Sequence, residues 1–127
     1  MKKSFLSSKI HKATVTDSHL DYEGSCEIDI SLLNAAGISV HEKIDIYNIT
    51  NGERFTTYAI EGKPETGNIC LNGACCHKAS IGDKIIICTY ADMDIKEIKN
   101  HKPKIIHVDD KNKILDSNNF DNMSLVE

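Results

Sequence analysis

The sequence feature that most restricts the fold is an Asn-Gly pair, Asn51-Gly52, that stands between two segments of alternating apolar and polar residues. The alternation runs along residues 43–49 and resumes along residues 53–60. Asn and Gly readily adopt the positive φ angles that tight hairpin turns need, so this pattern is the strongest short-range signal for a hairpin. We therefore expect an antiparallel pair of strands here.

Further strand-like segments indicate a mainly β fold. Residues 9–16 and 26–30 place apolar side chains at alternate positions, which is typical of strands with one buried face. Residues 68–71 repeat the hairpin pattern more weakly before a second Asn-Gly pair. Residues 84–90 form a continuous apolar run suited to a buried strand, and residues 105–108 are expected to add an edge strand. These strands are expected to close into a barrel.

Two short helices are expected beside the strands. Ser31 is suited to cap a helix that runs to Ala36, and Gly37 stands where a left-handed residue ends a helix. Asp92 is suited to cap a second helix over residues 95–100. Both helices are too short to change the mainly β character of the prediction.

The length of the chain indicates a single domain. A chain of 127 residues is close to the usual single-domain size, which leaves open that an active site needs a neighbouring subunit. We expect one β-barrel catalytic domain over residues 1–108. Residues 109–127 are rich in Asn, Asp and Ser, so we expect a polar, mobile C-terminal tail. Residues 17–25 are too polar for a core and are expected to form an exposed loop.

Charge and hydropathy argue against several classes of partner. The net charge is -4 and the sequence shows no strongly basic face, which disfavours nucleic acid and anionic membrane surfaces. No apolar stretch approaches the ~20 residues of a membrane span, and none long enough for a signal peptide follows the N-terminal lysines. We therefore expect a cytoplasmic protein with no membrane partner.

The cysteines fit a reducing compartment and not a metal site. Five cysteines are an odd number without the spacing of a disulfide scaffold. Cys75, Cys76 and His77 suggest zinc, but metal sites normally present spaced pairs, and adjacent cysteines in a strand or helix point in different directions. No metal is expected.

The polar segment 17–25 ends in a Gly-Ser dipeptide that has two interpretations. In the structural one, Gly24 and Ser25 only finish a turn before a strand. In the functional one, Ser25 Oγ attacks the Gly24 carbonyl and converts the amide to an ester, which glycine favours because it permits strained dihedral angles and leaves its carbonyl open. A donor must stabilise the oxyanion, and Glu23 or Tyr22 are candidates to assist. Elimination then leaves dehydroalanine, and hydrolysis converts it to a pyruvoyl group at residue 25.

Several separated motifs resemble the aspartate 1-decarboxylase family, and their order and spacing match as well. The motifs are Lys9 and His11, Tyr-Glu-Gly-Ser-Cys at 22–26, Thr-Asn-Gly-Glu-Arg-Phe-Thr-Thr-Tyr-Ala-Ile at 50–60, and Asn-Gly-Ala at 72–74. The resemblance covers about residues 1–108. It implies a double-psi β-barrel and a homotetramer with active sites between subunits.

The resemblance also implies an activity. The chain would be an inactive proenzyme that cuts itself between Gly24 and Ser25, and Ser25 would become a covalent pyruvoyl cofactor that forms a Schiff base with the substrate. Decarboxylation leaves a carbanion, and the pyruvoyl group supplies the electron sink that the ordinary side chains lack. The implied reaction converts L-aspartate to β-alanine and CO2 for pantothenate and coenzyme A biosynthesis. The sequence leaves open whether a maturation factor assists the cleavage.

The resemblance assigns roles to residues of the two hairpin segments and the first strand. Lys9 and Arg54 would bind the substrate carboxylates, Thr57 would present its hydroxyl to the Gly24 carbonyl and later to the substrate, and Tyr58 would donate the proton. Arg54 also stands out on its own, because the chain has fourteen lysines and one arginine and a carboxylate suits a bidentate fork. Each also has an ordinary interpretation, as an exposed cation, a strand threonine or a core tyrosine.

Further candidates follow the second Asn-Gly pair. Gly73, Ala74 and Cys75 would contact the substrate, since backbone groups beside a glycine can approach a ligand closely. The family more often has alanine where this chain has Cys75 and Cys76. His11, Tyr22 and Asn72 are possible further members of the site, although a structural role is an equal alternative for His11.

Three other classes remain as alternatives. A non-catalytic β-barrel binding module would keep an intact chain of about 14 kDa. A hydrolase using Ser25 or Cys26 with His11 lacks a nucleophile elbow and an evident orienting acid. A pyridoxal phosphate enzyme would need a longer chain and a cofactor lysine motif.

Overall fold

The computed structural model describes residues 1–115, and nearly half of these belong to one eight-stranded sheet. The strands are β1 (Lys3–Thr14), β2 (Asp17–His19), β3 (Ser25–Asp29), β4 (Lys43–Asn48), β5 (Arg54–Gly62), β6 (Ile69–Asn72), β7 (Lys84–Met93) and β8 (Lys104–His107). The helices are α1 (Ile30–Ala36), α2 (Ile95–Lys99) and a 3-10 helix, η1 (Gly73–His77). The prediction of a mainly β fold with short helices is confirmed.

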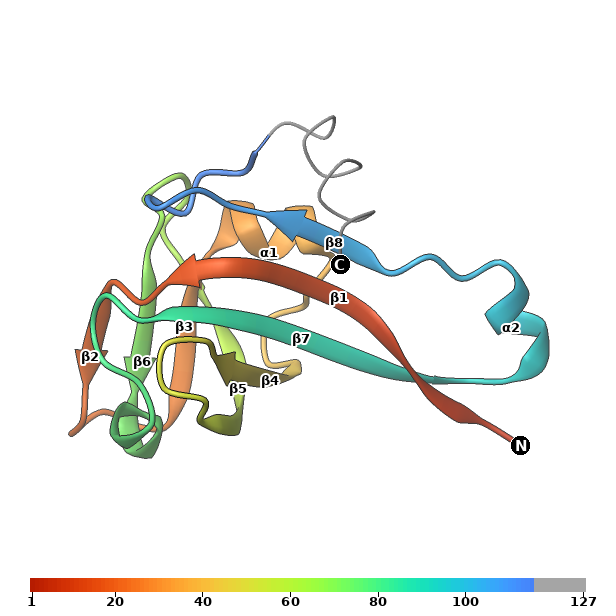
Figure 1. Cartoon of the computed structure of the whole chain (residues 1–127), viewed down its shortest axis with the longest axis horizontal. Coiled ribbons are helices and arrows are strands. Elements are labelled where there is room, and N and C mark those ends of the chain that lie inside the picture. Colours follow the sequence, from red (N-terminus) through yellow and green to blue (C-terminus); the bar gives the residue numbers. More distant parts are fainter. Residues whose placement is uncertain (116–127) are drawn as a thin grey trace.

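The strand order is β2-β6-β3-β5-β4-β7-β1-β8, so most neighbours in the sheet are distant in the sequence. Three pairs are parallel, namely β1 with β8, β2 with β6 and β3 with β5, and the others are antiparallel. In Figure 1 the long strands β1 and β7 run side by side and extend together toward α2. This curved mixed sheet is consistent with the double-psi β-barrel that the resemblance implies.

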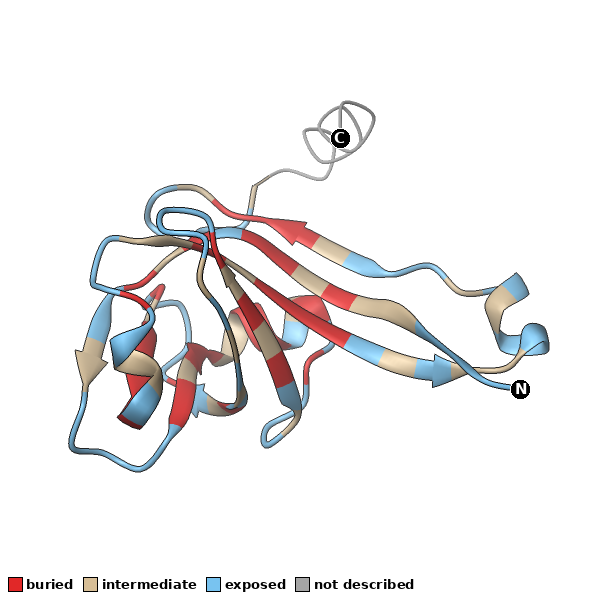
Figure 2. Cartoon of the chain, turned by 60° about the horizontal axis from the view of Figure 1, so that its bottom comes forward, coloured by how far each residue is buried: buried red, intermediate tan, exposed pale blue. Residues whose placement is uncertain are grey.

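The core is built mainly from isoleucines at alternate strand positions. Ile44 and Ile46 of β4 and Ile85 and Ile87 of β7 are fully buried, and their intervening neighbours are partly exposed. Because successive strand side chains point to opposite faces, this alternation gives each strand one buried face. Figure 2 shows the resulting alternation of buried and less buried positions along the strands.

The hairpin predicted around Asn51-Gly52 is confirmed. Strands β4 and β5 pair in antiparallel register, with Ile46 opposite Phe55. Gly52 adopts a φ of 79°, as the turn requires. The connection spans residues 49–53 because Asn48 Oδ1 accepts a hydrogen bond from the Thr50 backbone N–H at 2.9 Å, which extends the turn.

The N-cap residues of α1 and α2 differ from the predicted ones. Asp29, not Ser31, caps α1, since its carboxylate accepts from the Ser31 backbone N–H. Asp94, not Asp92, caps α2, because Asp94 exchanges hydrogen bonds with Glu97 in a capping box. The predicted C-cap of α1 is confirmed, with a left-handed Gly37 at a φ of 72°.

Two turn predictions were wrong. The exposed loop expected over residues 17–25 is limited to residues 20–24, because residues 17–19 form β2, which is polar yet pairs in parallel with β6. Ser25 is buried as the first residue of β3. The second Asn-Gly pair does not start a hairpin, because Gly73 has a φ of 76° and turns the chain into η1.

The first part of the expected tail packs on the sheet. Asn112 is buried, and its side-chain amide donates to the carbonyls of Thr14 at 2.9 Å and Gly67 at 2.7 Å. Ile114 forms an isolated bridge with Val108. The remainder of the expected tail, residues 116–127, lies outside the described residues.

Membrane-spanning helices were sought in residues 1–115. No helix in this range is both long and apolar enough to cross a membrane.

Asp29 joins the start of α1 to the loop after β5. Its buried carboxylate accepts hydrogen bonds from three backbone N–H groups, those of Ser31 at 2.8 Å, Glu65 at 3.0 Å and Gly67 at 2.9 Å. Burial raises the pKa of Asp29, but the hydrogen bonds from Gly67, Ser31 and Glu65 outweigh it, and the pKa is lowered below its usual value. The ionised form of Asp29 therefore stabilises the fold.

We predict that Asp29→Asn lowers the free energy of unfolding by about 1–3 kcal/mol near neutral pH, because one side-chain acceptor is lost. A lowered pKa means that the contribution is present above the unfolded pKa of about 3.9 and is lost as pH falls below it. Urea denaturation at several pH values tests this, with Glu61→Gln on the exposed strand surface as the control. A difference between Asp29→Asn and the parent that persists unchanged to about pH 3 would contradict it.

Candidate active site

A pocket of about 560 Å³ opens over strands β2, β6, β3 and β5, and most of its lining comes from alternate residues of these strands. Side chains two residues apart in a strand share a face, and paired residues on neighbouring strands stand next to each other. The lining therefore forms two rows across the sheet. Three further lining residues complete it, namely Tyr22, Glu23 and Asn68.

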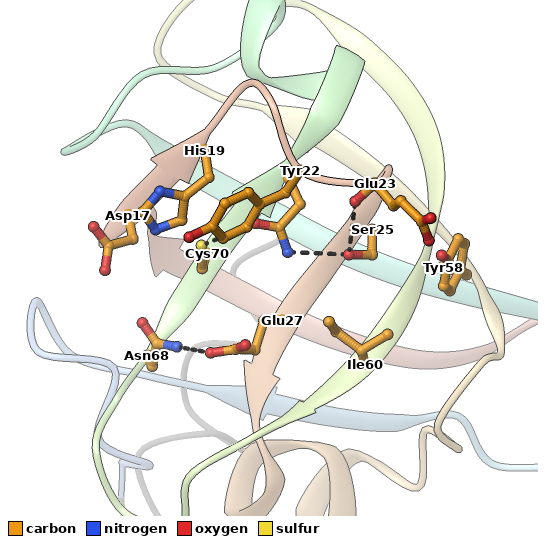
Figure 3. Close-up of a pocket in the computed structure, with 11 residues that line it drawn as sticks. Asp17, His19, Tyr22, Glu23, Ser25, Glu27, Tyr58, Ile60, Asn68 and Cys70 are labelled. Atoms are coloured by element: carbon orange, nitrogen blue, oxygen red, sulfur yellow. Dashed lines mark hydrogen bonds between the residues drawn. The ribbon is translucent and has the colours of Figure 1, made fainter.

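The first row carries the serine of the Gly-Ser dipeptide. His19 of β2 pairs with Asn72 of β6, which pairs with Ser25 of β3. Strand β3 pairs in parallel with β5, which adds Tyr58 beside Ser25. Figure 3 shows Ser25 between the ring of Tyr58 on one side and the pair of His19 and Tyr22 on the other.

The second row lies one pleat further along the same strands. It consists of Asp17 of β2, Cys70 of β6, Glu27 of β3 and Ile60 of β5. Asn68 Nδ2 donates a hydrogen bond to the Glu27 carboxylate. This row is acidic and thiol-bearing, whereas the first row is uncharged apart from its histidine.

Ser25 is held by hydrogen bonds on both sides of its hydroxyl. Its side chain is 4% exposed, and Oγ accepts a hydrogen bond from Asn72 Nδ2 at 3.0 Å. The hydroxyl donates to the backbone carbonyl of Glu23 at 3.4 Å. Since Glu23 and Ser25 flank Gly24, these contacts keep Oγ next to the Gly24 peptide.

Gly73 packs directly against the Gly24 peptide. A Cβ at residue 73 would lie 2.8 Å from Gly24 Cα and 2.9 Å from Gly24 N, closer than real Cβ contacts come. A Cβ at Gly24 itself would meet no atom within 4 Å. One side of the Gly24–Ser25 segment is therefore tightly packed by the Asn72-Gly73 corner, and the other side is open.

The 3-10 helix η1 also brings Cys75 to this segment. Cys75 Sγ donates to the Asn72 carbonyl at 3.1 Å and lies 3.7 Å from the Ser25 carbonyl. Ala74 precedes it on the exposed side of η1. Gly73 and Cys75 thus lie beside Gly24 and Ser25.

Tyr22 packs against the histidine of the first row. The Tyr22 and His19 rings stack with centroids 4.6 Å apart, and the Tyr22 backbone N–H donates to the His19 carbonyl at 3.3 Å. These contacts fix the short connection from β2 to Gly24. Tyr58 stands at the rim of the pocket, 38% exposed, with its ring centroid 6.3 Å from that of His41.

The expected cations lie on other parts of the sheet. Lys9 is half-buried in β1, opposite Cys88 of β7. Arg54 is exposed at the start of β5, with its guanidinium over the Tyr47 ring at 4.6 Å. Arg54 shares a strand face with Tyr58, but Tyr58 follows it by four positions, which correspond to about 13 Å along the strand.

Two further expected residues face away from the pocket. Thr57 is adjacent to Tyr58 in β5, so its side chain points to the opposite face of the strand. His11 is buried in β1, where its ring meets the edge of the His107 ring at a centroid distance of 5.1 Å. Within one chain, the structure thus brings Tyr22, Gly24, Ser25, Tyr58, Asn72, Gly73 and Cys75 together and places Lys9, His11, Arg54 and Thr57 elsewhere.

The thiols near Ser25 are protonated at neutral pH. Burial, aided by the neighbouring thiols of Cys75 and Cys70, raises the pKa of Cys26 well above its usual value. Burial also raises the pKa of Cys75, with Cys76 adding to the effect. A nucleophilic cysteine needs a lowered pKa, His11 lies away from this pocket, and Asn72 stands between His19 and Ser25 in the first row. The arrangement therefore disfavours a Ser-His or Cys-His hydrolase.

Metal ligation and disulfides were sought as well. Within the described range, residues 1–115, no group of three or more His, Cys, Asp or Glu side chains is arranged to hold a metal ion. All five cysteines are free thiols.

Asp17, His19, Glu27 and Cys70 line the pocket but were absent from the sequence-based site. The sequence does contain one indication of them. Each stands two residues from another lining residue on the same strand, so the two side chains share a face. This spacing identifies pocket residues only when the pairing of β2, β6 and β3 is known.

Comparison with known proteins places the chain among the decarboxylases. The sequence model of the family described as aspartate decarboxylase matches residues 1–115. The chain belongs to this family.

Curated relatives agree with this assignment over nearly their whole length. Proteins named aspartate 1-decarboxylase from Ralstonia nicotianae and Hydrogenovibrio crunogenus are 54% and 52% identical to the chain, over 114 and 119 residues. The matches cover 90% and 94% of this chain and 95% and 92% of the relatives. A protein of the same name from Caldicellulosiruptor bescii is 54% identical over 110 residues, which cover 87% of this chain and 86% of that relative.

The contact between Gly73 and Gly24 predicts a difference between two glycine variants. Gly73 and Gly52 have similar φ angles, 76° and 79°, but a Cβ at Gly52 would meet no atom within 4 Å. We expect Gly52→Ala to lower the free energy of unfolding by about 1 kcal/mol through backbone strain alone. Gly73→Ala should cost at least about 1 kcal/mol more, because the new methyl group clashes with backbone. If urea denaturation gave the two variants equal losses in the free energy of unfolding, the Gly24 backbone would have moved to accommodate the new methyl group, which contradicts the prediction.

Proposed function

We propose that the chain is an aspartate 1-decarboxylase proenzyme that cuts itself between Gly24 and Ser25 and then converts L-aspartate to β-alanine and CO2. The reaction would supply pantothenate and coenzyme A biosynthesis. The observation that carries the proposal is the position of Ser25 Oγ, which Asn72 and the Glu23 carbonyl hold beside the Gly24 peptide. Membership of the aspartate decarboxylase family supports the choice of reaction.

The cleavage begins with attack of Ser25 Oγ on the carbonyl carbon of Gly24. The C–N bond to Ser25 breaks, an ester bond to Oγ forms, and the hydroxyl proton moves to the Ser25 nitrogen. Elimination then releases Gly24 as a carboxylate and leaves a dehydroalanine at residue 25. Water replaces its nitrogen, which departs as ammonia, and the new N-terminus is a pyruvoyl group. The open side of Gly24 leaves room for the tetrahedral intermediate.

The pocket fits a pyruvoyl group at residue 25. The residue 25 side chain opens into a pocket of about 560 Å³, with Asn72 and Tyr58 beside it. The pyruvoyl ketone would supply the electron sink for decarboxylation. The Tyr58 hydroxyl would donate the proton that replaces CO2 and recover one from solvent.

The charges around the pocket support a site that two subunits share. Asp17, Glu23 and Glu27 line the pocket of one chain and would repel a dianionic substrate, so the substrate needs cations. Lys9 and Arg54 lie away from this pocket on the strand faces described above. We propose that a second copy in a homotetramer completes the site with these cations, which bind the β-carboxylate. The departing α-carboxylate would occupy a less polar place.

The other parts of the proposal concern the setting of the enzyme. We place it in the cytoplasm, where reduced cysteines are expected. Residues 1–108 would form the catalytic domain, with Thr57 assisting both cleavage and substrate binding. His11 would have a structural or tuning role.

We predict that Ser25→Ala abolishes both self-cleavage and β-alanine formation, because the variant has no hydroxyl to attack Gly24. Denaturing gel electrophoresis and a β-alanine assay provide the readouts. Ser80→Ala, in an exposed turn, is the matched control and should cleave and turn over like the parent. β-Alanine formation by an uncut Ser25→Ala protein would refute the proposed function.

We predict that Tyr58→Phe still cleaves but turns over at least about tenfold more slowly, because the ring remains and only the proton donor is lost. The extent of cleavage, measured by mass spectrometry of the same sample, is the internal control. A fully cleaved variant with parental kcat would remove Tyr58 from the role of proton donor.

A further inference from the structure

Cys70 and Asn72 lie on the same face of β6 and form a hydrogen-bonded chain with Ser25. Cys70 Sγ donates to Asn72 Oδ1 at 3.4 Å, and Asn72 Nδ2 donates to Ser25 Oγ at 3.0 Å. Figure 3 shows Cys70 and Ser25 among the side chains that line the pocket. The thiol is thus linked to the attacking hydroxyl without touching it.

The direction of the serine proton depends on the orientation of the Asn72 amide, that is, on whether Nδ2 or Oδ1 faces Ser25. With Nδ2 toward Ser25, the amide donates to Oγ, and the serine hydroxyl is left to donate to the Glu23 carbonyl. With the amide turned over, Oδ1 would compete for the serine proton and draw it away from Gly24. Both ends have nearly the same shape, so packing alone distinguishes them poorly.

A thiol beside Asn72 discriminates between the two ends. It donates a hydrogen bond but accepts one only weakly, so Oδ1 is favoured toward Cys70 and Nδ2 toward Ser25. Burial strengthens this preference, since Cys70 and Asn72 are each 5% exposed and water has little access to replace a lost partner.

We propose that Cys70 is a positioning residue for self-cleavage, whose thiol fixes the orientation of the Asn72 amide and thereby aims the Ser25 hydroxyl. This inference rests on the proposed function and adds to it a residue that contacts neither the Gly24 peptide nor Ser25. By this proposal Cys70, in the second row of the pocket, affects the reaction of Ser25 in the first row.

The acidic neighbours of Cys70 suit this role. Asp17 and Glu27 stand opposite Cys70 on β2 and β3. Burial raises the pKa of Cys70 to about 11, and the charges of Asp17 and Glu27 contribute after burial. The thiol therefore keeps its proton, and remains a donor, throughout the neutral range.

The rate of self-cleavage of freshly purified full-length chain, followed by denaturing mass spectrometry, tests the proposal. Cys70→Val replaces the thiol with a slightly larger apolar side chain and removes the donor, and we expect cleavage to slow about 5- to 10-fold, the effect of one hydrogen bond. Cys70→Ser retains a proton to donate, but its oxygen also accepts, so it should cleave faster than Cys70→Val and more slowly than the parent. The control is Cys76→Ala, whose thiol donates to the Leu71 carbonyl at 3.2 Å, and it should cleave at the parental rate.

The outcomes separate this inference from the proposed function. Parental cleavage by Cys70→Val, or equal slowing of Cys70→Ser and Cys70→Val, would overturn the role of Cys70 while leaving self-cleavage intact. A parent chain that never cleaves would instead overturn the proposed function. If Cys70→Val does not fold, as judged by circular dichroism, the comparison of Cys70→Ala with Cys70→Ser decides in the same way, because both remove volume and only serine donates.

Discussion

The pairing of Ser25 with Asn72 across strands β3 and β6 is the interaction on which the rest of the site depends. It buries the serine hydroxyl against a side-chain amide and makes the following Gly73 pack on the Gly24 backbone. Because the same two strands also place Cys70 opposite Glu27, one register sets both rows of the pocket. A slip of one residue would turn all these side chains to the other face of the sheet.

The site combines a rigid side with an open one. Gly73 and the η1 thiol of Cys75 confine the backbone around Ser25, whereas Gly24 has free space on its other face. This arrangement suits a chain that must hold a nucleophile beside its own peptide bond and still admit a tetrahedral intermediate. The acidic lining of the same pocket does not suit an anionic substrate, so we assign substrate binding to cations from a second copy.

The features that could be predicted from the sequence are those that depend on neighbouring residues in the chain or on recognisable motifs. The hairpin at Asn51-Gly52 follows from turn chemistry, and the candidate serine follows from motifs that are spaced along the chain. The sequence could not predict β2, because three polar residues acquire strand structure only by pairing with β6. It could not find Cys70 for a related reason, since its importance depends on which strand lies next to β6. The α1 cap was misplaced because Asp29 serves the helix and a distant loop at once.

The most direct test of the central claim is the denaturing mass spectrum of the purified wild-type chain. We expect two fragments, one ending at Gly24 and one beginning at residue 25, with the second lighter than a serine-terminated fragment by the mass of ammonia. Decarboxylation of L-aspartate should appear in proportion to that second fragment. A single intact chain that forms β-alanine, or a cut chain whose second fragment keeps an N-terminal serine while fully active, would contradict the account.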